Sequence, residues 1–210
     1  QQTAAATGKT LTLSAVTGVN GGVGWLATDV GRIVSFNSGK AKITARTNAT
    51  VAVATITTDF ANTDATAAFK LGAFSDTTGH PSCVSFFEQR LVFAGTTDEP
   101  QTLYFSKSGD YENMTTGTNA DDAMVYTIAS NQVNKIRYLK AVRTLLIGTT
   151  GGEFSVSADG TDAAVTPTNV TIKRQSSFGA ANVDAQPSGN AVLFLQRAKR
   201  KIRELAYNYD

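Results

Sequence analysis

Apolar and polar residues alternate along the first sixty residues, and this alternation predicts short β-strands. In residues 10–15 every second side chain is apolar, which is typical of a half-buried strand. Four such runs lie close together, at 10–15, 31–36, 40–45 and 50–56. An Asn-Ser-Gly turn at 37–39 predicts a β-hairpin, and the glycine-dense segment 18–24 predicts a flexible loop. We therefore expect a compact antiparallel barrel or sandwich.

The rest of the chain repeats one short apolar sequence pattern that is typical of a β-strand. Its copies begin at Leu91, Leu145 and Val192, which are 54 and 47 residues apart, and each copy precedes a second strand. This spacing is close to the roughly 40–50 residues of a four-stranded propeller blade. Further strands are expected at 84–87, 124–128, 136–139 and 170–173. Two blades and part of a third cannot close a propeller, so either the ring continues outside this chain or the sheets form an open sandwich.

These patterns predict an all-β fold in two domains, with the boundary near residue 75. Residues 1–75 are expected to form a small antiparallel β-barrel, and residues 76–210 a propeller-like region of repeated sheets. Because the chain begins with Gln1-Gln2 and not with methionine, we expect it to be a segment of a longer protein.

Composition narrows the possible functions. Hydrophobic residues make up 41% of the chain and charged residues only 17%, and a net charge of +2 is too small to indicate nucleic-acid binding by itself. No apolar run approaches the roughly 18 residues that a membrane-spanning helix needs. A single cysteine, Cys83, excludes an intramolecular disulfide and is expected to be a small buried apolar residue.

Few residues suggest catalysis. Residues 6–10 end like a phosphate-binding loop, but Thr3 stands where that motif requires glycine, so we expect no nucleotide. The only histidine, His80, lies between glycine and proline and is expected to be a turn residue. The acidic pairs Asp98-Glu99 and Asp121-Asp122 are expected to be loop charges, although a glycosidase can bring distant carboxylates together.

Metal binding is not expected either. Asp110, Glu112 and Asn113 offer oxygen ligands but lack the spacing of a known calcium loop. We therefore expect no metal, no cofactor and no catalytic residue in this chain.

The strongest candidate for a functional site is a basic cluster near the C-terminus. It places five basic residues within seven positions: Arg197, Lys199, Arg200, Lys201 and Arg203. The cluster is either a solvated β-turn or a contact for a phosphate backbone or an acidic partner protein.

Several short sequence segments, which follow one another along the chain, resemble one family. They cover 79–82, 86–96, 100–102, 106–113, 129–134, 146–153, 167–170, 189–194 and 203–207. The match resembles tail nozzle or hub proteins of short-tailed bacteriophages and prophages, similar to tail tubular protein B. The segment 29–34 is similar to the small β-barrel named after the FCCH domain of ubiquitin-activating enzymes, a label that implies no ubiquitin chemistry.

The resemblance implies a structural, non-enzymatic virion protein, made in the bacterial host cytoplasm and assembled into the tail. It further implies a six-fold homo-oligomeric ring, contacts with portal-side or adaptor-side tail proteins, and transient contact with DNA during genome ejection. Two alternatives stay open. A module that binds host-surface glycan would need Trp25, Tyr104, Tyr111 or Tyr126 exposed beside acids in a groove, and a glycan-degrading enzyme would need two carboxylates in one pocket.

Overall fold

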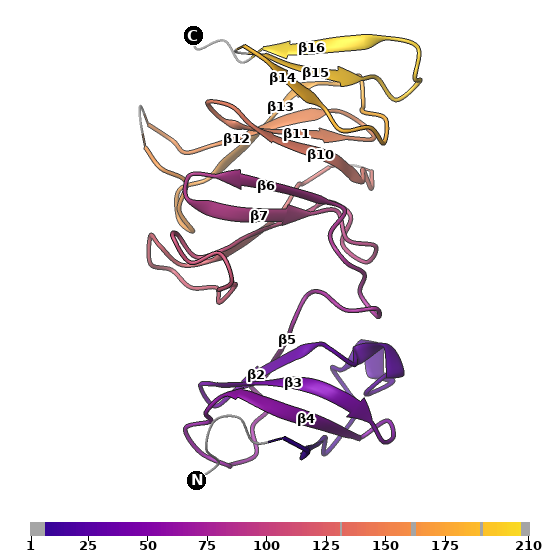
Figure 1. Cartoon of the computed structure of the whole chain (residues 1–210), viewed down its shortest axis with the longest axis vertical. Coiled ribbons are helices and arrows are strands. Elements are labelled where there is room, and N and C mark those ends of the chain that lie inside the picture. Colours follow the sequence, from indigo (N-terminus) through magenta and orange to yellow (C-terminus); the bar gives the residue numbers. More distant parts are fainter. Residues whose placement is uncertain (1–6, 131, 161–162, 190, 207–210) are drawn as a thin grey trace. The chain divides into compact units, whose positions relative to one another are not determined.

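The computed structural model describes residues 7–130, 132–160, 163–189 and 191–206 (Figure 1). It confirms the all-β class, with 45% of the residues in strands and 3% in helices. The chain divides into two compact units, Gln1–His80 and Pro81–Asp210. Each unit is described separately below.

The first unit is one antiparallel sheet with strand order β1-β4-β3-β2-β5. Its elements are β1 (Lys9–Thr12), the short 3₁₀ helices η1 (Asn20–Gly22) and η2 (Ala27–Asp29), β2 (Ile33–Phe36), β3 (Gly39–Arg46), β4 (Val51–Thr58) and β5 (Lys70–Leu71). Among the described residues β1 pairs only with β4, and β5 pairs only with β2. The sheet is therefore open, and the expected closure into a barrel is wrong because these two edge strands do not pair with each other.

The predicted hairpin is confirmed, and its turn has two residues. Asn37 and Ser38 join β2 to β3 with φ angles of 43° and 61°. Positive φ at both positions matches a type I′ turn, whose twist suits the flanking strands. Ser38 therefore holds a backbone conformation that glycine would adopt with less strain.

The glycine-dense loop is more ordered than its composition suggests. Gly24 has a φ of 81°, and a Cβ there would lie 2.2 Å from the Ala49 carbonyl oxygen. This close approach requires glycine and delivers the next residue, Trp25, into the core, where its exposed fraction is 2%. The buried residues around it are Val19, Val34, Ile43 and Ala52.

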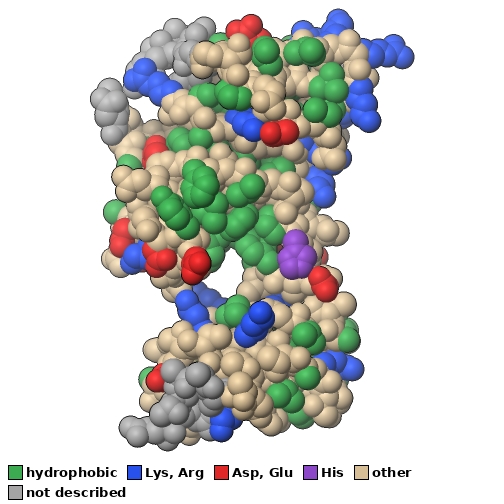
Figure 2. All heavy atoms as spheres, viewed as in Figure 1, with side chains coloured by type: hydrophobic (Ala, Val, Ile, Leu, Met, Phe, Trp, Pro, Cys, Tyr) green, Lys and Arg blue, Asp and Glu red, His purple; other side chains and the backbone are tan. Residues whose placement is uncertain are grey.

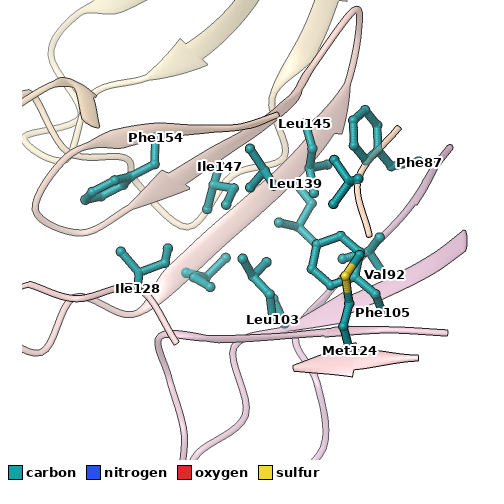
Figure 3. Packing of buried hydrophobic residues seen from close by; sticks show 14 residues of the cluster. Phe87, Val92, Leu103, Phe105, Met124, Ile128, Leu139, Leu145, Ile147 and Phe154 are labelled. Atoms are coloured by element: carbon teal, nitrogen blue, oxygen red, sulfur yellow. The ribbon is translucent and has the colours of Figure 1, made fainter. Parts of the chain in front are cut away.

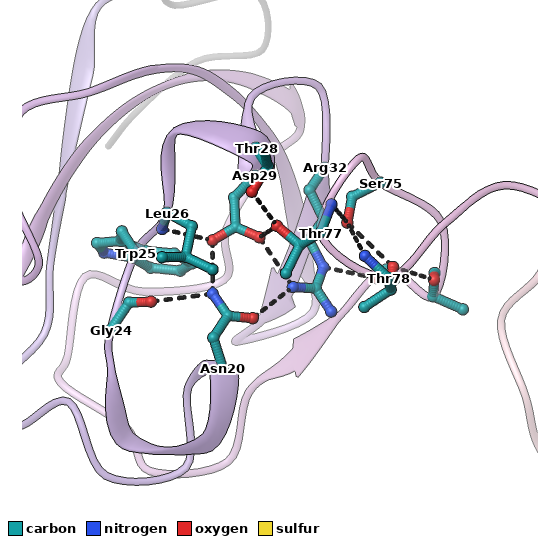
Figure 4. A network of polar contacts seen from close by, with 12 residues as sticks. Asn20, Gly24, Trp25, Leu26, Thr28, Asp29, Arg32, Ser75, Thr77 and Thr78 are labelled. Atoms are coloured by element: carbon teal, nitrogen blue, oxygen red, sulfur yellow. Dashed lines mark hydrogen bonds and ion pairs between the residues drawn. The ribbon is translucent and has the colours of Figure 1, made fainter. Parts of the chain in front are cut away.

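A buried polar network ties the end of the first unit to its sheet (Figure 4). Asp29 is fully buried, and its Oδ1 accepts hydrogen bonds from Arg32 Nη1 at 3.0 Å and Thr77 Oγ1 at 2.8 Å. Arg32 Nε in turn donates to the Gly72 carbonyl oxygen at 2.8 Å. These bonds place residues 72–78 in the first unit, so the division falls at His80, five residues beyond the expected boundary.

The second unit contains three antiparallel sheets, named here blades 1, 2 and 3. Blade 1 contains β6 (Cys83–Phe87), β7 (Arg90–Ala94), β8 (Thr102–Phe105) and β9 (Met124–Thr127). Blade 2 contains β10 (Ile136–Ala141), β11 (Leu145–Thr149), β12 (Glu153–Ser157) and β13 (Thr171–Ser176). Blade 3 contains β14 (Gln186–Ser188), β15 (Ala191–Leu195) and β16 (Ile202–Ala206). Within each blade the strands pair in sequence order, as the repeat predicts.

The blades stack face to face in sequence order (Figure 1). One cluster fills the space between blades 1 and 2, with Val92, Leu103 and Phe105 packed against Leu145 and Ile147 (Figure 3). A second cluster lies between blades 2 and 3, and its members are Tyr138, Leu146, Ala180, Ala185, Val192 and Phe194. Blade 2 is thus covered on both faces, which explains why the central strand β11 is apolar without alternation.

In the described part of the chain, no helix is long and apolar enough to cross a membrane.

Candidate functional site

The predicted basic cluster lies on the turn that joins β15 to β16. Backbone bonds shape this turn: Lys199 N donates to the Gln196 carbonyl at 2.7 Å, and Gln196 N donates to the Lys201 carbonyl at 2.9 Å. Lys199 adopts a φ of 57°, in the left-handed region. The five basic residues are therefore brought together by one local element, here called the basic turn (residues 196–203).

Two of the five basic residues anchor the turn. Arg197 Nη1 donates to the Thr150 carbonyl oxygen at 3.1 Å, which links the turn to blade 2. Arg203 places its guanidinium carbon 4.0 Å from the ring centroid of Phe178, a cation–π contact, and donates from Nε to Gln196 Oε1 at 3.2 Å. Both arginines therefore hold the turn in place through contacts within the chain.

The other three basic residues, Lys199, Arg200 and Lys201, are exposed. Within the described residues, no hydrogen bond or ion pair involves their side chains. Figure 2 shows basic side chains gathered at the end of blade 3 where β15 turns into β16. The arrangement is an anchored turn that presents three positive charges to solvent, which suits contact with a phosphate backbone or an acidic protein.

The residues considered for catalysis are not assembled into a site. Lys9 and Thr10 lie in β1 and not at a helix N-terminus, whereas Ala6 lies outside the described residues. His80 is exposed and pairs with Asp76, with 3.1 Å between Nε2 and Oδ1. Cys83 is half-buried at the start of β6, and burial raises the pKa of its thiol, which disfavours the reactive thiolate.

The acidic pairs serve local contacts. Lys107 Nζ lies 2.9 Å from Asp121 Oδ2 and 3.6 Å from Asp122 Oδ1, and the contact with Asp121 raises the pKa of Lys107. Glu99 Oε2 accepts a hydrogen bond from Thr102 Oγ1 at 2.8 Å, whereas Asp98 is exposed.

The oxygen-rich segment at Asp110, Glu112 and Asn113 forms a turn, with Asn113 N donating to the Asp110 carbonyl at 3.2 Å. The described residues include no group of three or more histidine, cysteine, aspartate or glutamate side chains placed to hold a metal ion.

The aromatic residues proposed for glycan binding do not form one exposed platform. Trp25 and Tyr104 are buried, and burial raises the pKa of Tyr104 to about 12. Tyr126 is half-buried and donates from its hydroxyl to the Pro167 carbonyl at 2.7 Å. Tyr111 is exposed, but its ring packs edge-on against Phe86, with 5.2 Å between centroids.

One cleft lies where the three blades meet. Its volume is about 320 Å³, and it is lined by parts of β6, β10 and residues 182–184. Polar side chains pair across it: Lys140 Nζ lies 2.7 Å from Asp184 Oδ2, and Arg137 Nη1 donates to Asn182 Oδ1 at 3.3 Å. These side chains serve the joint between blades 2 and 3.

Sequence reasoning missed two buried charged residues. Arg90, the first residue of β7, is 2% exposed and donates to the carbonyls of Ser106, Ala120 and Asp122. Glu153, the first residue of β12, is fully buried and accepts a hydrogen bond from Ser176 Oγ, and burial raises its pKa. Neither position carries a local sequence signal, because their partners lie about 15–30 residues away in the chain.

Comparison with known proteins adds no identification: no family model and no curated protein matches this chain.

Proposed function

We propose that this chain is a structural, non-enzymatic component of a bacteriophage tail, part of the nozzle or hub wall through which DNA leaves the virion. The observation that carries the proposal is a stack of β-sheets that holds the basic turn, on which Lys199, Arg200 and Lys201 are exposed and make no hydrogen bond or ion pair among the described residues. The family resemblance of residues 79–207 supports the same function. The proposal places the protein in the virion, in a homo-oligomeric ring that contacts portal-side tail proteins.

The basic turn suits a surface that DNA passes. A duplex carries one negative charge per roughly 1.7 Å of its axis, so a few exposed lysines or arginines attract it without reading its sequence. Three charges give weak contact at physiological salt, because each neutralised phosphate contributes only about one counterion to the salt dependence. Strong binding would slow a passing duplex, so few charges on a rigid turn match the proposed conduit.

The DNA contact can be tested with the purified chain and a short fluorescent duplex. Lys199→Gln combined with Lys201→Gln should weaken binding and lower the slope of log K against log salt by about 2, since two phosphate contacts are removed. The matched control replaces Lys42 and Lys173, which are exposed on other sheets, and removes the same charge. If test and control variants bind equally, the basic turn is not the DNA contact.

The virion role is tested in a phage that carries the gene. Neutralising Lys199, Arg200 and Lys201 together should barely change the stability of the fold, since exposed charges contribute little. It should instead reduce incorporation into particles or DNA delivery. A triple variant that assembles and infects like the parent would show that the turn has no role there, and absence of the wild-type chain from purified particles would overturn the proposal.

A further inference from the structure

The segment that follows β5 is held to the first unit by polar contacts. Residues 72–79, here called the strap, come after the two-residue strand β5 and precede the second unit, which begins at Pro81. Among the described residues, the apolar cluster of the first unit takes its side chains from positions 11–71 and none from the strap. Ser75, which is 3% exposed, is the one buried residue of the strap. The strap therefore adds little buried apolar surface to this unit.

Two charged residues of the first unit fasten the strap (Figure 4). At its start the Gly72 carbonyl oxygen accepts a hydrogen bond from Arg32 Nε at 2.8 Å. Near its end Thr77 Oγ1 donates to Asp29 Oδ1 at 2.8 Å and lies 2.7 Å from Thr28 Oγ1. Because a hydroxyl has one proton to donate and Thr77 gives it to the carboxylate, Thr28 is the donor in the second contact. The ion pair of Asp29 and Arg32 thus holds both ends of the strap.

The strap also maintains its own shape. Ser75 Oγ accepts hydrogen bonds from the Thr77 and Thr78 amides, both at 3.2 Å. Thr78 Oγ1 donates to the Ala73 carbonyl oxygen at 2.6 Å. Gly79 N donates to the Ser75 carbonyl oxygen at 2.7 Å. These bonds join residues that are close in sequence, so the strap is a local turn that can form or break as one piece.

Asp29 keeps other partners when its bond to the strap is broken. Its Oδ2 accepts hydrogen bonds from Leu26 N at 2.8 Å and from Asn20 Nδ2 at 2.6 Å. Arg32 Nη1 stays 3.0 Å from Oδ1 and balances the charge of the carboxylate. Opening of the strap therefore costs the charge-assisted bond to Thr77, but it leaves no unpaired charge in the buried site.

Opening of the strap changes the length of free chain between the two units. With the strap closed, only His80 and Pro81 separate it from Ser82, whose amide is hydrogen-bonded into blade 1 at 3.0 Å. With the strap open, residues 72–81 are free, and about ten extended residues span at most about 35 Å, compared with about 7 Å for two. The exposed pair of His80 and Asp76, with 3.1 Å between Nε2 and Oδ1, lies within the freed segment and does not hold it to the sheet.

We propose that the strap opens and closes as one piece, separately from the sheet of the first unit, with Asp29 as its latch. The closed state gives the two units a short tether, and the open state gives them a long one. The reason for the separation is that a segment with little buried apolar surface opens at a smaller free energy than the core of a domain does. This device goes beyond the proposed function, because it involves neither the basic turn nor assembly into a particle.

Hydrogen exchange of backbone amides, followed by NMR, measures the opening directly. The amides of Gly72, Thr77, Thr78 and Gly79 are all hydrogen-bonded in the closed strap, so they should share one protection factor. The Ile43 amide is bonded within the sheet, where it donates to the carbonyl of the residue that precedes β2, and it should be protected at least about tenfold more strongly.

Thr77→Val removes the latch bond and keeps the shape of the side chain. Loss of a hydrogen bond to a charged group should raise the exchange rates of all strap amides together, by about tenfold to a hundredfold, and leave Ile43 unchanged. Chymotrypsin should also cleave faster after Phe74 in this variant. Thr44→Val is the matched control, because Thr44 Oγ1 donates to the Val53 carbonyl oxygen within the β3–β4 pair and its loss should leave strap exchange unchanged.

Three results would overturn the proposal. Strap amides protected as strongly as Ile43 would mean that the strap opens only when the whole unit unfolds. Unequal changes among the four strap amides in Thr77→Val would mean that the strap does not move as one piece. Wild-type exchange rates in Thr77→Val would show that Asp29 is not the latch. These measurements involve neither DNA nor particles, so this proposal and the proposed function fail separately.

Discussion

Replacing Arg90 with methionine should destabilise the second unit strongly and leave the first unit unchanged. Arg90 begins β7, and its guanidinium donates to three carbonyl oxygens at 2.6–2.8 Å, those of Ser106, Ala120 and Asp122. These bonds fasten the segment between β8 and β9 to blade 1. Methionine has similar length but offers no donor, so all three bonds are lost together.

The size of the effect follows from the bonds and their surroundings. A hydrogen bond that involves a charged group contributes about 1.5–3 kcal/mol to stability. The sum of three such bonds at the upper value would exceed the loss expected here, for two reasons. Burial of the guanidinium itself carries a desolvation cost that methionine avoids, and water can reach the exposed residues Ala120 and Asp121. We therefore expect a loss of about 3 kcal/mol in the free energy of unfolding. Arg90→Lys keeps the charge but lacks the planar fork, so it should lose about half as much.

Urea unfolding can follow the two units separately. Trp25 is the only tryptophan and lies in the core of the first unit, so tryptophan fluorescence reports on that unit. Far-ultraviolet circular dichroism reports on the strands of both units. With a slope of about 2 kcal/mol per M urea, the dichroism transition of the second unit should move down by about 1.5 M in Arg90→Met. The Trp25 transition should stay in place.

The control for this prediction is Arg200→Met, because Arg200 is exposed on the basic turn and its loss should change stability by less than about 0.5 kcal/mol. A loss below about 1 kcal/mol in Arg90→Met would refute the reasoning, since the three bonds would then contribute no more than a solvated surface charge does.

Three further changes test the buried polar groups and the hairpin. In Asp29, burial opposes ionisation, but bonds from Leu26, Thr77 and the other partners outweigh it and lower the pKa. Asp29→Asn should therefore cost about 3 kcal/mol at pH 7, and the wild-type advantage, present above the unfolded pKa of about 3.9, should shrink as acid titration passes the lower folded pKa. In Glu153, burial raises the pKa, so the contribution of this side chain to the stability of the fold is present below the unfolded pKa of about 4.3 and is lost as pH rises through the folded pKa. Glu153→Gln should therefore raise the free energy of unfolding by about 1 kcal/mol at pH 7 and leave it unchanged at pH 4, as measured by urea titration at both pH values. Ser38→Gly should stabilise the first unit by about 0.5 kcal/mol in the Trp25 transition, because its φ is 61°.

The strands could be predicted because their signals are local. Short apolar runs, turn residues and the repeat spacing placed three meander sheets in the second unit, and the structure contains them with the expected strand order. The apolar run at Leu145–Ile147 could be predicted as a strand, but its central position comes from the structure, where all three residues are buried and the two faces of β11 meet different blades.

The differences from expectation depend on contacts between distant residues. The division at His80 lies five residues beyond the expected boundary near residue 75, because Asp29 holds Thr77, 48 residues away, and no local pattern reveals that bond. Closure of the first sheet into a barrel failed because it depends on pairing between the two ends of the unit, whereas each hairpin is decided by its own turn.

The basic turn shows the same division within a single site. Its five basic residues could be identified because they lie within seven positions of one hairpin. Which of them are anchors was decided by Thr150 and Phe178, which come from blade 2 and the segment that follows it. A charge cluster in sequence therefore locates a candidate site, but only the fold separates the charges that anchor the turn from those that face solvent.

That separation connects stability to function in this protein. Arg197 and Arg203 make contacts within the chain, so replacing either residue would shift the turn as well as change its charge. Lys199, Arg200 and Lys201 contribute almost nothing to the fold, so selection for stability alone gives no reason for three adjacent positive side chains. The proposed DNA contact therefore rests on the three exposed charges, and the two arginines enter it only by holding the turn that carries them.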